Sequence, residues 1–328
     1  MKKLSLGHTS PKYSEEVKDD ALFHYTTAAG LLGILCSKQL WSTAYYCAND
    51  ESELSAARGF LTPIIRKQTS KMIDEEDSRV KFLSRMGANI QDHADRFEEI
   101  IVNHTLNALC IYITCFCRPS TEEEFHHGLL SQWRGYGEDG GYAIQFSRSK
   151  LKKTVDLINL SQETNYDIQD VHYSVENPYK AEVVKHADAF INAYLEHLDG
   201  VININWNRPT LNSPTSSLTG GPLESLLDYL VNTKNEHFRE EKECRLSLLE
   251  TTKANSGVLP VEYYNRNGLL VPFTRTPDKF SLIDCIDWVI VGPSSGIEQR
   301  FMSLKQMVKK MGLDINIRPS HIPYSRSL

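Results

Sequence analysis

Long apolar stretches are missing from this sequence of 328 residues. No segment approaches the roughly 20 apolar residues that cross a bilayer, so no membrane partner is expected. The charged start, Met1-Lys2-Lys3, is not followed by the apolar core of a secretory signal. We therefore expect a cytoplasmic protein. Its 41% hydrophobic and 24% charged residues are typical of a globular chain with a buried core.

Paired cysteines and a basic surface are also lacking. The seven cysteines are scattered, and although Cys115 and Cys117 share one face of a predicted strand, no second pair stands at zinc-ligand spacing. We interpret them as reduced packing residues and expect no metal. The net charge of −6 gives no basic field to hold a phosphate backbone, so bulk nucleic-acid binding is not expected.

Several common catalytic signatures are absent. The sequence contains no Walker A motif, no Gly-x-Gly-x-x-Gly at a helix start, no His-Glu-x-x-His and no Gly-x-Ser-x-Gly. The function must therefore be sought in less regular groups of residues.

Residues 1–20 are polar and predict a flexible arm, and residues 21–328 predict a single α+β domain with a helical insertion at about 53–108. Short strands interrupted by helices, without regular βαβ alternation, favour a mixed, mostly antiparallel central sheet over a doubly wound one. The clearest elements are a buried strand at 109–117 and an amphipathic helix at 297–311.

Three segments carry candidate functional residues, and the first is His24-Tyr25-Thr26 at the end of a predicted strand. Strand alternation puts Phe23 and Tyr25 on one side and His24 on the other. An imidazole beside a hydroxyl can exchange hydrogen bonds with a sugar hydroxyl. The alternative interpretation is a core histidine bonded to the backbone.

The second segment is Ser131–Gly137, which we interpret as a glycine-flanked turn because glycine lets the backbone approach a ligand. Trp133 and Tyr136 offer flat faces for an aromatic ring, and Arg134 can bind a phosphate or carboxylate with its planar guanidinium group. These groups suit a nucleotide-like ligand. The alternative is a Gly-rich hairpin in which Trp133 fills the core and Arg134 pairs with an acid.

The third segment places Glu241, Glu243 and Arg245 at alternate positions, so a strand would carry all three on one face. Two such acids, roughly 7 Å apart, can bind a sugar, stabilise a cation or divide acid and base roles. The alternative is a solvated face on which Arg245 bridges the acids. Lys234 is a candidate for a supporting role.

At these segments the chain resembles the bacterial domain-of-unknown-function 2971 family. The resemblance runs from about residue 20 to beyond residue 290, and the family label itself carries no activity. The matching stretches are Leu22–Thr26, Gly30–Leu35, Leu40-Trp41, Asn49–Glu51, Leu130–Gly137, Phe238 with Glu241-x-Glu243-x-Arg245, and Ile290–Pro293.

The first block, Phe23–Thr26 followed by an apolar helix through Gly33–Leu35, is also similar to the start of ADP-ribosyltransferases of the His-Tyr-Glu type. In that family a strand-borne His holds an NAD ribose, a Tyr stacks on nicotinamide, and a Glu on a late strand steadies the oxocarbenium ion. The resemblance implies a split central sheet and NAD as the substrate.

Carried onto this sequence, the resemblance implies that His24 takes the ribose role, helped by Thr26. Glu243, or Glu241, takes the catalytic role, because a nearby carboxylate stabilises positive charge that builds on the sugar. Tyr25 departs from the family pattern, since it stands where the family has Gly.

The middle block, Trp-Arg-Gly-Tyr-Gly, departs from the family's Gly-x-Tyr strand and helix, so either Tyr136 or Trp133 would stack on nicotinamide. Arg134 would hold the pyrophosphate. The remaining residues expected around the ligand are Tyr25, Ser131 and Arg245.

The leading hypothesis is an NAD-consuming, ADP-ribosyltransferase-like enzyme or NAD glycohydrolase with an unknown macromolecular acceptor. By resemblance, its role would be that of a toxin or phage-defence effector. A second hypothesis is a non-catalytic module that senses a nucleotide or peptide. A third, a metal-dependent hydrolase or nuclease using Glu241 and Glu243, lacks the Asp and His residues that would complete its site. The leading hypothesis requires that the three segments converge on one ligand.

Overall fold

The computed structural model describes residues 13–47, 63–64, 66–67, 70–78, 81, 111–136, 140–162, 164–173, 184–185, 188–189, 192, 231–249, 260–266 and 268–323. Most of the arm expected at 1–20 and most of the insertion expected at 53–108 lie outside the described residues. So do Asn49–Glu51 and Gly137.

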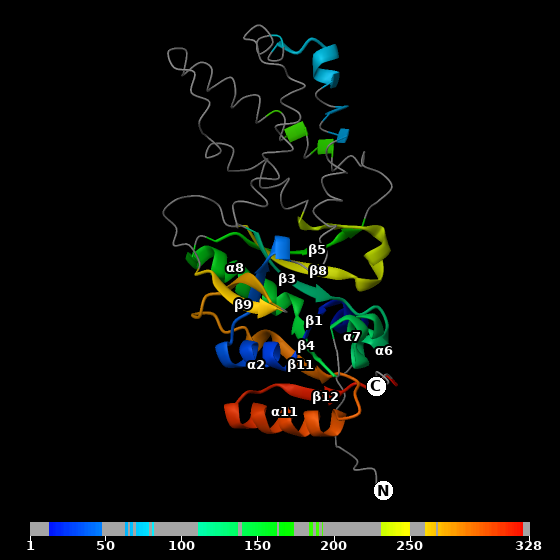
Figure 1. Ribbon diagram of the computed structural model, residues 1–328, viewed down its shortest axis with the longest axis vertical. Helices are drawn as coiled ribbons and strands as arrows, with labels where there is room; N and C mark the ends of the chain where they lie inside the picture. Colours follow the sequence, from blue (N-terminus) through cyan, green and yellow to red (C-terminus); the bar gives the residue numbers. More distant parts are fainter. Residues whose placement is uncertain are drawn as a thin grey trace.

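A ten-stranded, mostly antiparallel sheet forms the centre of the described chain (Figure 1). The strand order is β12-β11-β4-β1-β3-β2-β10-β9, and β8 pairs with β3 as an additional neighbour and carries β5 on its far side. Only β11 and β12 run parallel among these described strands. The expected α+β class with a mixed, mostly antiparallel sheet is therefore confirmed. The strands are β1 (Ala21–Thr26), β2 (Trp41–Ala44), β3 (Ile111–Cys117), β4 (Tyr142–Ser147), β5 (Tyr166–Asp170), β8 (Glu243–Leu249), β9 (Glu262–Arg266), β10 (Leu269–Arg275), β11 (Ile286–Val291) and β12 (Asn316–Pro319).

Smaller elements connect and flank this sheet. Strands β6 (His172–Tyr173) and β7 (Thr233–Lys234) pair in parallel as a separate two-stranded sheet. Short helices are α1 (Glu15–Asp19), η1 (Tyr45–Cys47), η3 (Glu236–Glu241) and η4 (Ile283–Cys285). Helix α11 (Ile297–Met311) has the bounds that the sequence indicated.

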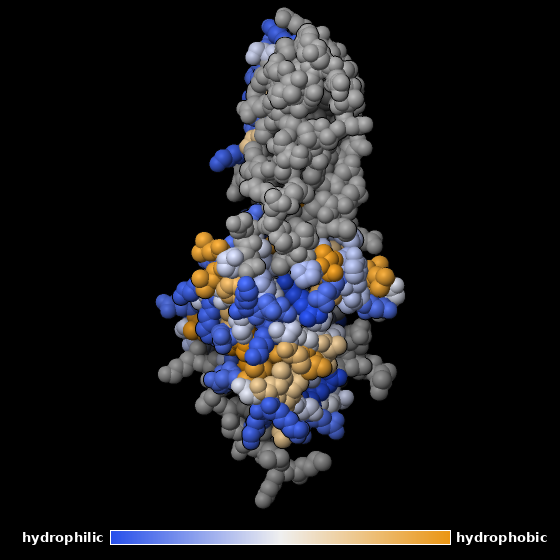
Figure 2. Space-filling model, turned by 90° about the vertical axis from the view of Figure 1, so that its left-hand side faces the viewer, coloured by the Kyte–Doolittle hydropathy of each residue, from blue (hydrophilic) through white to orange (hydrophobic). Residues whose placement is uncertain are grey.

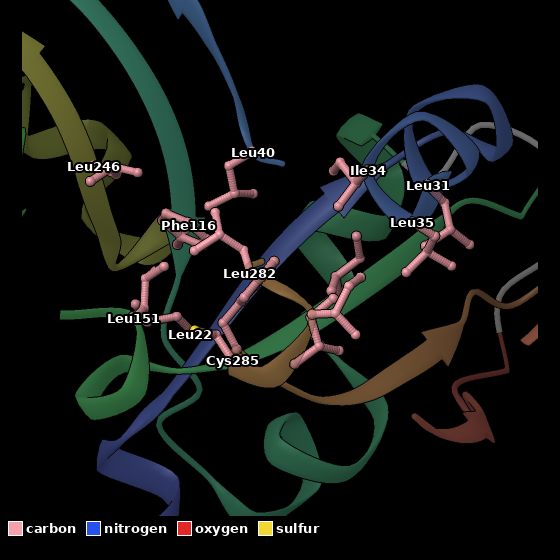
Figure 3. Packing of buried hydrophobic residues seen from close by; sticks show 14 of the residues in the cluster. Leu22, Leu31, Ile34, Leu35, Leu40, Phe116, Leu151, Leu246, Leu282 and Cys285 are labelled. Atoms are coloured by element: carbon pink, nitrogen blue, oxygen red, sulfur yellow. The ribbon is translucent and has the colours of Figure 1, made fainter. Parts of the chain in front are cut away.

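One face of the sheet, called here the α2 face, is covered by α2 (Ala28–Ser37), α8 (Arg148–Gln162) and α11. Leucine and isoleucine side chains of these helices pack on strand residues such as Leu22, Phe116 and Leu246, most of which are fully buried (Figure 3). Burial of apolar surface is the main favourable term in folding, so this face supplies most of the stabilisation.

The opposite face, called here the α7 face, carries α6 (Glu122–His127) and α7 (Leu130–Tyr136). Phe23 and Tyr25 of β1 pack there with Leu129 and Trp133. Because side chains alternate along a strand, the two residues lie on the side opposite Leu22. On the side seen in Figure 2, the described surface is mixed, with hydrophobic patches among the hydrophilic residues.

Local sequence fixes how β1 leads into α2. The Thr27 side chain accepts a hydrogen bond from the backbone nitrogen of Gly30, which caps the first turn. A side chain at position 30 would lie too close to Thr26 Oγ1, so the Thr26 side chain would have to move to accept any larger residue there. The helix ends at Lys38, whose φ of 60° is left-handed.

The sheet opens between β1 and β3. These strands share a single registered pair, Phe23 with Cys117. Farther along β3, the same edge pairs with β2 at Tyr112 and Ile113. The stretch of β3 between these two contacts has no registered partner on that side within the described residues. This gap positions the candidate site.

Candidate functional site

A cavity of about 360 Å³ lies on the α7 face beside the gap between β1 and β3. All three segments singled out in the sequence contribute to its wall: the end of β1, α7, and the start of β8 with the preceding η3. The lining residues are Phe23, His24, Tyr25, Trp41, Thr43, Cys47, Ile113, Thr114, Cys115, Cys117, Gln132, Tyr136, Lys234, Phe238, Glu241, Glu243, Arg245 and Arg266.

His24 enters this wall through the gap. Its register with Ile144 places it on the α2 side of β1, but its Nδ1 lies 2.9 Å from the carbonyl oxygen of Cys115 on β3. Because a carbonyl only accepts, Nδ1 carries the proton and Nε2 of the neutral ring is an acceptor. Burial lowers the pKa of His24, which favours the neutral ring. The ring also meets the Phe116 ring edge to face at 5.8 Å.

Glu243 lies at the buried end of the cavity with both carboxylate oxygens engaged. Arg245 Nε donates to Oε1 at 2.7 Å, Arg245 Nη2 donates to Oε2 at 3.1 Å, and Lys234 Nζ donates to Oε2 at 3.1 Å. Burial alone would raise the pKa of Glu243, but the charge and hydrogen bonds of Arg245, and then Lys234, lower it to about 2. Glu243 is therefore ionised throughout the physiological range.

Glu241 is the more accessible of the two acids. Its side chain is 20% exposed, against 3% for Glu243, and its Oε2 accepts from Lys234 Nζ at 2.8 Å. Lys234, Glu241, Glu243 and Arg245, called here the charged quartet, have no net formal charge. Lys234 Nζ lies between the two carboxylates and bridges them.

The alternative predicted from the sequence was a solvated face on which Arg245 pairs with the acids. The pairing with Glu243 is observed, but the exposure to solvent is not. Arg245 and Glu243 are 1% and 4% exposed. A buried pair excludes water and holds its geometry, which a solvated surface pair does not.

Aromatic and cationic groups complete the wall. Tyr136, at the end of α7, is 38% exposed, and Phe238 is half-buried with its ring 4.9 Å from Lys234 Nζ. Arg266 of β9 donates to the carbonyl oxygen of Cys47 at 2.6 Å. The cavity thus offers ring faces for stacking and a guanidinium group suited to a phosphate.

The segment expected to be a glycine-flanked turn is helical instead. Residues Leu130–Tyr136 form α7, with Gly135 inside it. Gln132 and Tyr136 are four positions apart and therefore lie on one face of the helix, which is the face that lines the cavity. Ser131 and Arg134, which the resemblance placed around the ligand, lie on α7 but do not line the cavity.

Trp133 cannot stack on a ligand, which corrects one of the expected roles. It is 1% exposed, its Nε1 donates to the carbonyl oxygen of His127 at 2.9 Å, and Tyr25 meets its ring edge to face at 4.8 Å. A Cβ at Gly128 or Gly292 would lie within 2.8 Å of the indole. Trp133 therefore fills the core, as the alternative interpretation held.

Tyr25 and Thr26 have local structural contacts. The Tyr25 hydroxyl accepts from the backbone nitrogen of Leu129 at 2.7 Å, which ties β1 to the start of α7, and burial raises its pKa well above the usual value. Its side chain still borders the cavity. Thr26 packs against Gly30 and does not line the cavity.

Sequence reasoning missed Gln132, Trp41, Phe238 and Arg266 as lining residues. The 3.6-residue period would have selected Gln132 with Tyr136, had the segment been interpreted as a helix. Trp41 and Arg266 come from strands far apart in the chain, and no local pattern marks them. The described residues contain no group of three or more His, Cys, Asp or Glu side chains placed to hold a metal.

The described chain is thus an α+β protein with a mostly antiparallel sheet and a buried charged quartet beside an open cavity. Residues 132–246 match the sequence model of a family described as protein of unknown function, DUF2971, which supports the resemblance that the sequence indicated. The matched segment contains the lining residues of α7 and the whole charged quartet. No curated protein and no solved structure matches the chain. No helix in the described part is long and apolar enough to cross a membrane.

Proposed function

We propose that this protein is an NAD-consuming, ADP-ribosyltransferase-like enzyme, whose cavity binds NAD and whose residues promote cleavage of the nicotinamide–ribose bond. One observation carries the proposal. His24, Tyr136 and the acidic start of β8, from three distant segments, line a single cavity at the opening between β1 and β3. An enzyme that consumes NAD in this way depletes its host cell of the cofactor, which suits a toxin or phage-defence effector.

The chemistry calls for a carboxylate beside the ribose. When the bond breaks, its electron pair leaves with nicotinamide and positive charge develops on the sugar, which water or an acceptor nucleophile then attacks with loss of a proton. A fixed carboxylate in a cleft of low dielectric stabilises that charge. The geometry favours Glu241 for this role, because its side chain is 20% exposed toward the cavity it lines, whereas Glu243 is 3% exposed with both oxygens held by Arg245 and Lys234.

Other groups bind the substrate. The Nε2 acceptor of His24 is suited to a ribose hydroxyl, and the exposed ring of Tyr136 is suited to stacking on a base. The pyrophosphate role moves from Arg134 to Arg266, because Arg266 lines the cavity and Arg134 does not.

Incubation of the pure protein with NAD, followed by chromatography of free nicotinamide, tests the proposal. Glu241→Gln keeps the shape of the side chain and should lower turnover at least ~10²-fold, the usual loss when electrostatic stabilisation of a transition state is removed. Glu240→Gln is the matched control, since Glu240 is exposed and does not line the cavity. Wild-type turnover in both Glu241→Gln and Glu243→Gln would remove the carboxylate from the mechanism.

A second candidate, a nucleotide-binding module without turnover, is favoured by the complete pairing of Glu243. A carboxylate neutralised by two cations stabilises new positive charge less well than one that is not. Calorimetric titration with NAD distinguishes the candidates. Binding that weakens in Tyr136→Ala, with no nicotinamide released by the wild type, supports the module and rejects the enzyme.

A further inference from the structure

The lysine of the charged quartet is buried, and the elements around it are tied together by hydrogen bonds. Lys234 is on β7, registered with Tyr173 of β6, and is 8% exposed. Tyr173 Oη accepts from the backbone nitrogen of Glu243 at 2.7 Å, and Arg245 Nη1 donates to the carbonyl oxygen of Val231. The β6–β7 pair therefore fixes both the lysine and the start of β8, which carries Glu243.

Stability alone does not account for a lysine in this place. Taking an ammonium group out of water is unfavourable, and buried ion pairs typically return little more than that cost. Apolar residues in place of the whole ion-paired group would often serve folding as well, whereas loss of Lys234 alone would leave two carboxylates without their shared cation. What the lysine provides, and an apolar residue would not, is a bridge between the two acids: Lys234 Nζ donates to Glu241 at 2.8 Å and to Glu243 at 3.1 Å.

The two cations of the quartet do different things. Arg245 grips both oxygens of Glu243 and so fixes that carboxylate alone. Lys234 connects Glu243 to Glu241, which is at the end of η3 and is followed by Lys242 with a left-handed φ of 46°. Without the ammonium group, two adjacent carboxylates would repel each other and Glu241 would turn away.

We propose that Lys234 is a positioning residue for the proposed reaction: it holds Glu241 and Glu243 side by side as two anions, with the Glu241 carboxylate toward the ligand. The inference rests on the proposed function for its effect on turnover. Its effect on the carboxylates does not depend on turnover.

Kinetics of NAD cleavage test the catalytic part. Lys234→Gln should lower kcat about 10²-fold with KM changed less than about threefold, because a displacement of roughly 1 Å at a reacting group has an effect of that size. Lys234→Arg restores the charge and should recover most of kcat. Lys242→Gln is the matched control, because Lys242 pairs with Glu124 at 3.2 Å and does not line the cavity. An equal loss in Lys242→Gln would overturn the proposal.

Carbon-13 NMR of labelled glutamate carboxyls tests the electrostatic part without any turnover. In Lys234→Gln the pKa of Glu243 should rise, because one of its two cations is gone, and in Lys242→Gln it should stay low. The charged or titratable groups that face Glu243 are Lys234, Arg245, Glu241, Cys115, Cys117 and Tyr173. An unchanged Glu243 pKa in Lys234→Gln overturns the proposal, even if the protein does not cleave NAD.

A double variant tests whether Lys234 acts through Glu241, and Lys234→Arg, which keeps the buried charge, keeps the kinetic test usable if Lys234→Gln folds poorly. In Glu241→Gln, the charge that Lys234 positions is absent, so adding Lys234→Gln should lower kcat by less than about threefold more and should also raise the pKa of Glu243. Folding is checked by circular dichroism. A further loss as large as that in the wild-type background would show that Lys234 does not act through Glu241.

Discussion

The two faces of the central sheet come from the same strands but hold different chemistry. On β8, Leu246 and Cys244 point to the α2 face and are fully buried, whereas Glu243 and Arg245 point to the α7 face and are 4% and 1% exposed. Water is excluded on both sides. The two faces of β8 are therefore buried to a similar extent, and they differ in what that burial does for the protein.

The α2 face stabilises the fold because apolar burial contributes without any need for exact partners. The α7 face contributes less to stability, because the cost of desolvating its charges offsets their attraction. In return it holds four charged groups in fixed positions beside a cavity. The comparison predicts large losses of stability from truncations on the first face and pH-dependent or local effects on the second.

The largest effect is expected from Phe116, whose ring is fully buried on the α2 face and meets Phe146 edge to face at 5.6 Å. Phe116→Ala should lower the free energy of unfolding by about 3–5 kcal/mol, since it removes buried surface and leaves a cavity. Urea denaturation followed by circular dichroism measures this. Leu270→Ala is the control, because Leu270 is 69% exposed. A loss below about 1 kcal/mol for Phe116→Ala would contradict the assignment of the core to this face.

Strong sequence patterns predicted the elements of the apolar face well. The stripe of Ile297, Phe301 and Leu304 gave α11 with its observed bounds, and the apolar run before Arg118 gave β3. In both cases the local period and the final packing agree. The α+β class followed from the order of these elements.

The site was harder to predict because it depends on register between distant strands. Alternation along β1 correctly separated His24 from Tyr25. That Glu243 of β8 shares the face of Tyr25 follows only from two pairings, Phe23 with Cys117 and Cys117 with Glu243. Glu241, which the alternate spacing placed on the same strand, lies before β8 at the end of η3. In α7, glycine suggested a turn, but burial of Trp133 overrode that local preference.

An intermediate effect is expected from acid on the charged face. The pKa of Glu243 is lowered in the folded protein to about 2 from a usual 4.5. A lowered pKa contributes stability that is present above the unfolded value and is lost as pH falls from about 4.5 toward 2. The contribution at neutral pH is on the order of 3 kcal/mol.

Denaturation at pH 7 and pH 3 of the wild type and of Glu243→Gln measures this contribution. The wild type should lose stability between these pH values, and Glu243→Gln should lose less, because its amide does not titrate. Glu240→Gln, on the exposed side of η3, should behave as the wild type. Equal pH dependence in all three proteins would show that the quartet does not hold Glu243 as an anion.

The smallest effects on stability are expected at two glycines on the α7 face, Gly128 just before α7 and Gly135 within it. Gly128 has a φ of 80°, and a Cβ there would lie 2.7 Å from the indole nitrogen of Trp133. Gly135 lies within α7 with open space around it. Gly128→Ala should therefore destabilise the protein by about 1–3 kcal/mol, and Gly135→Ala should stabilise it by about 0.5–1 kcal/mol. Thermal denaturation of the two variants and the wild type shows whether each substitution lowers or raises the stability. A stabilising Gly128→Ala would mean that the indole does not pack against that turn, and Trp133 would again become available to a ligand.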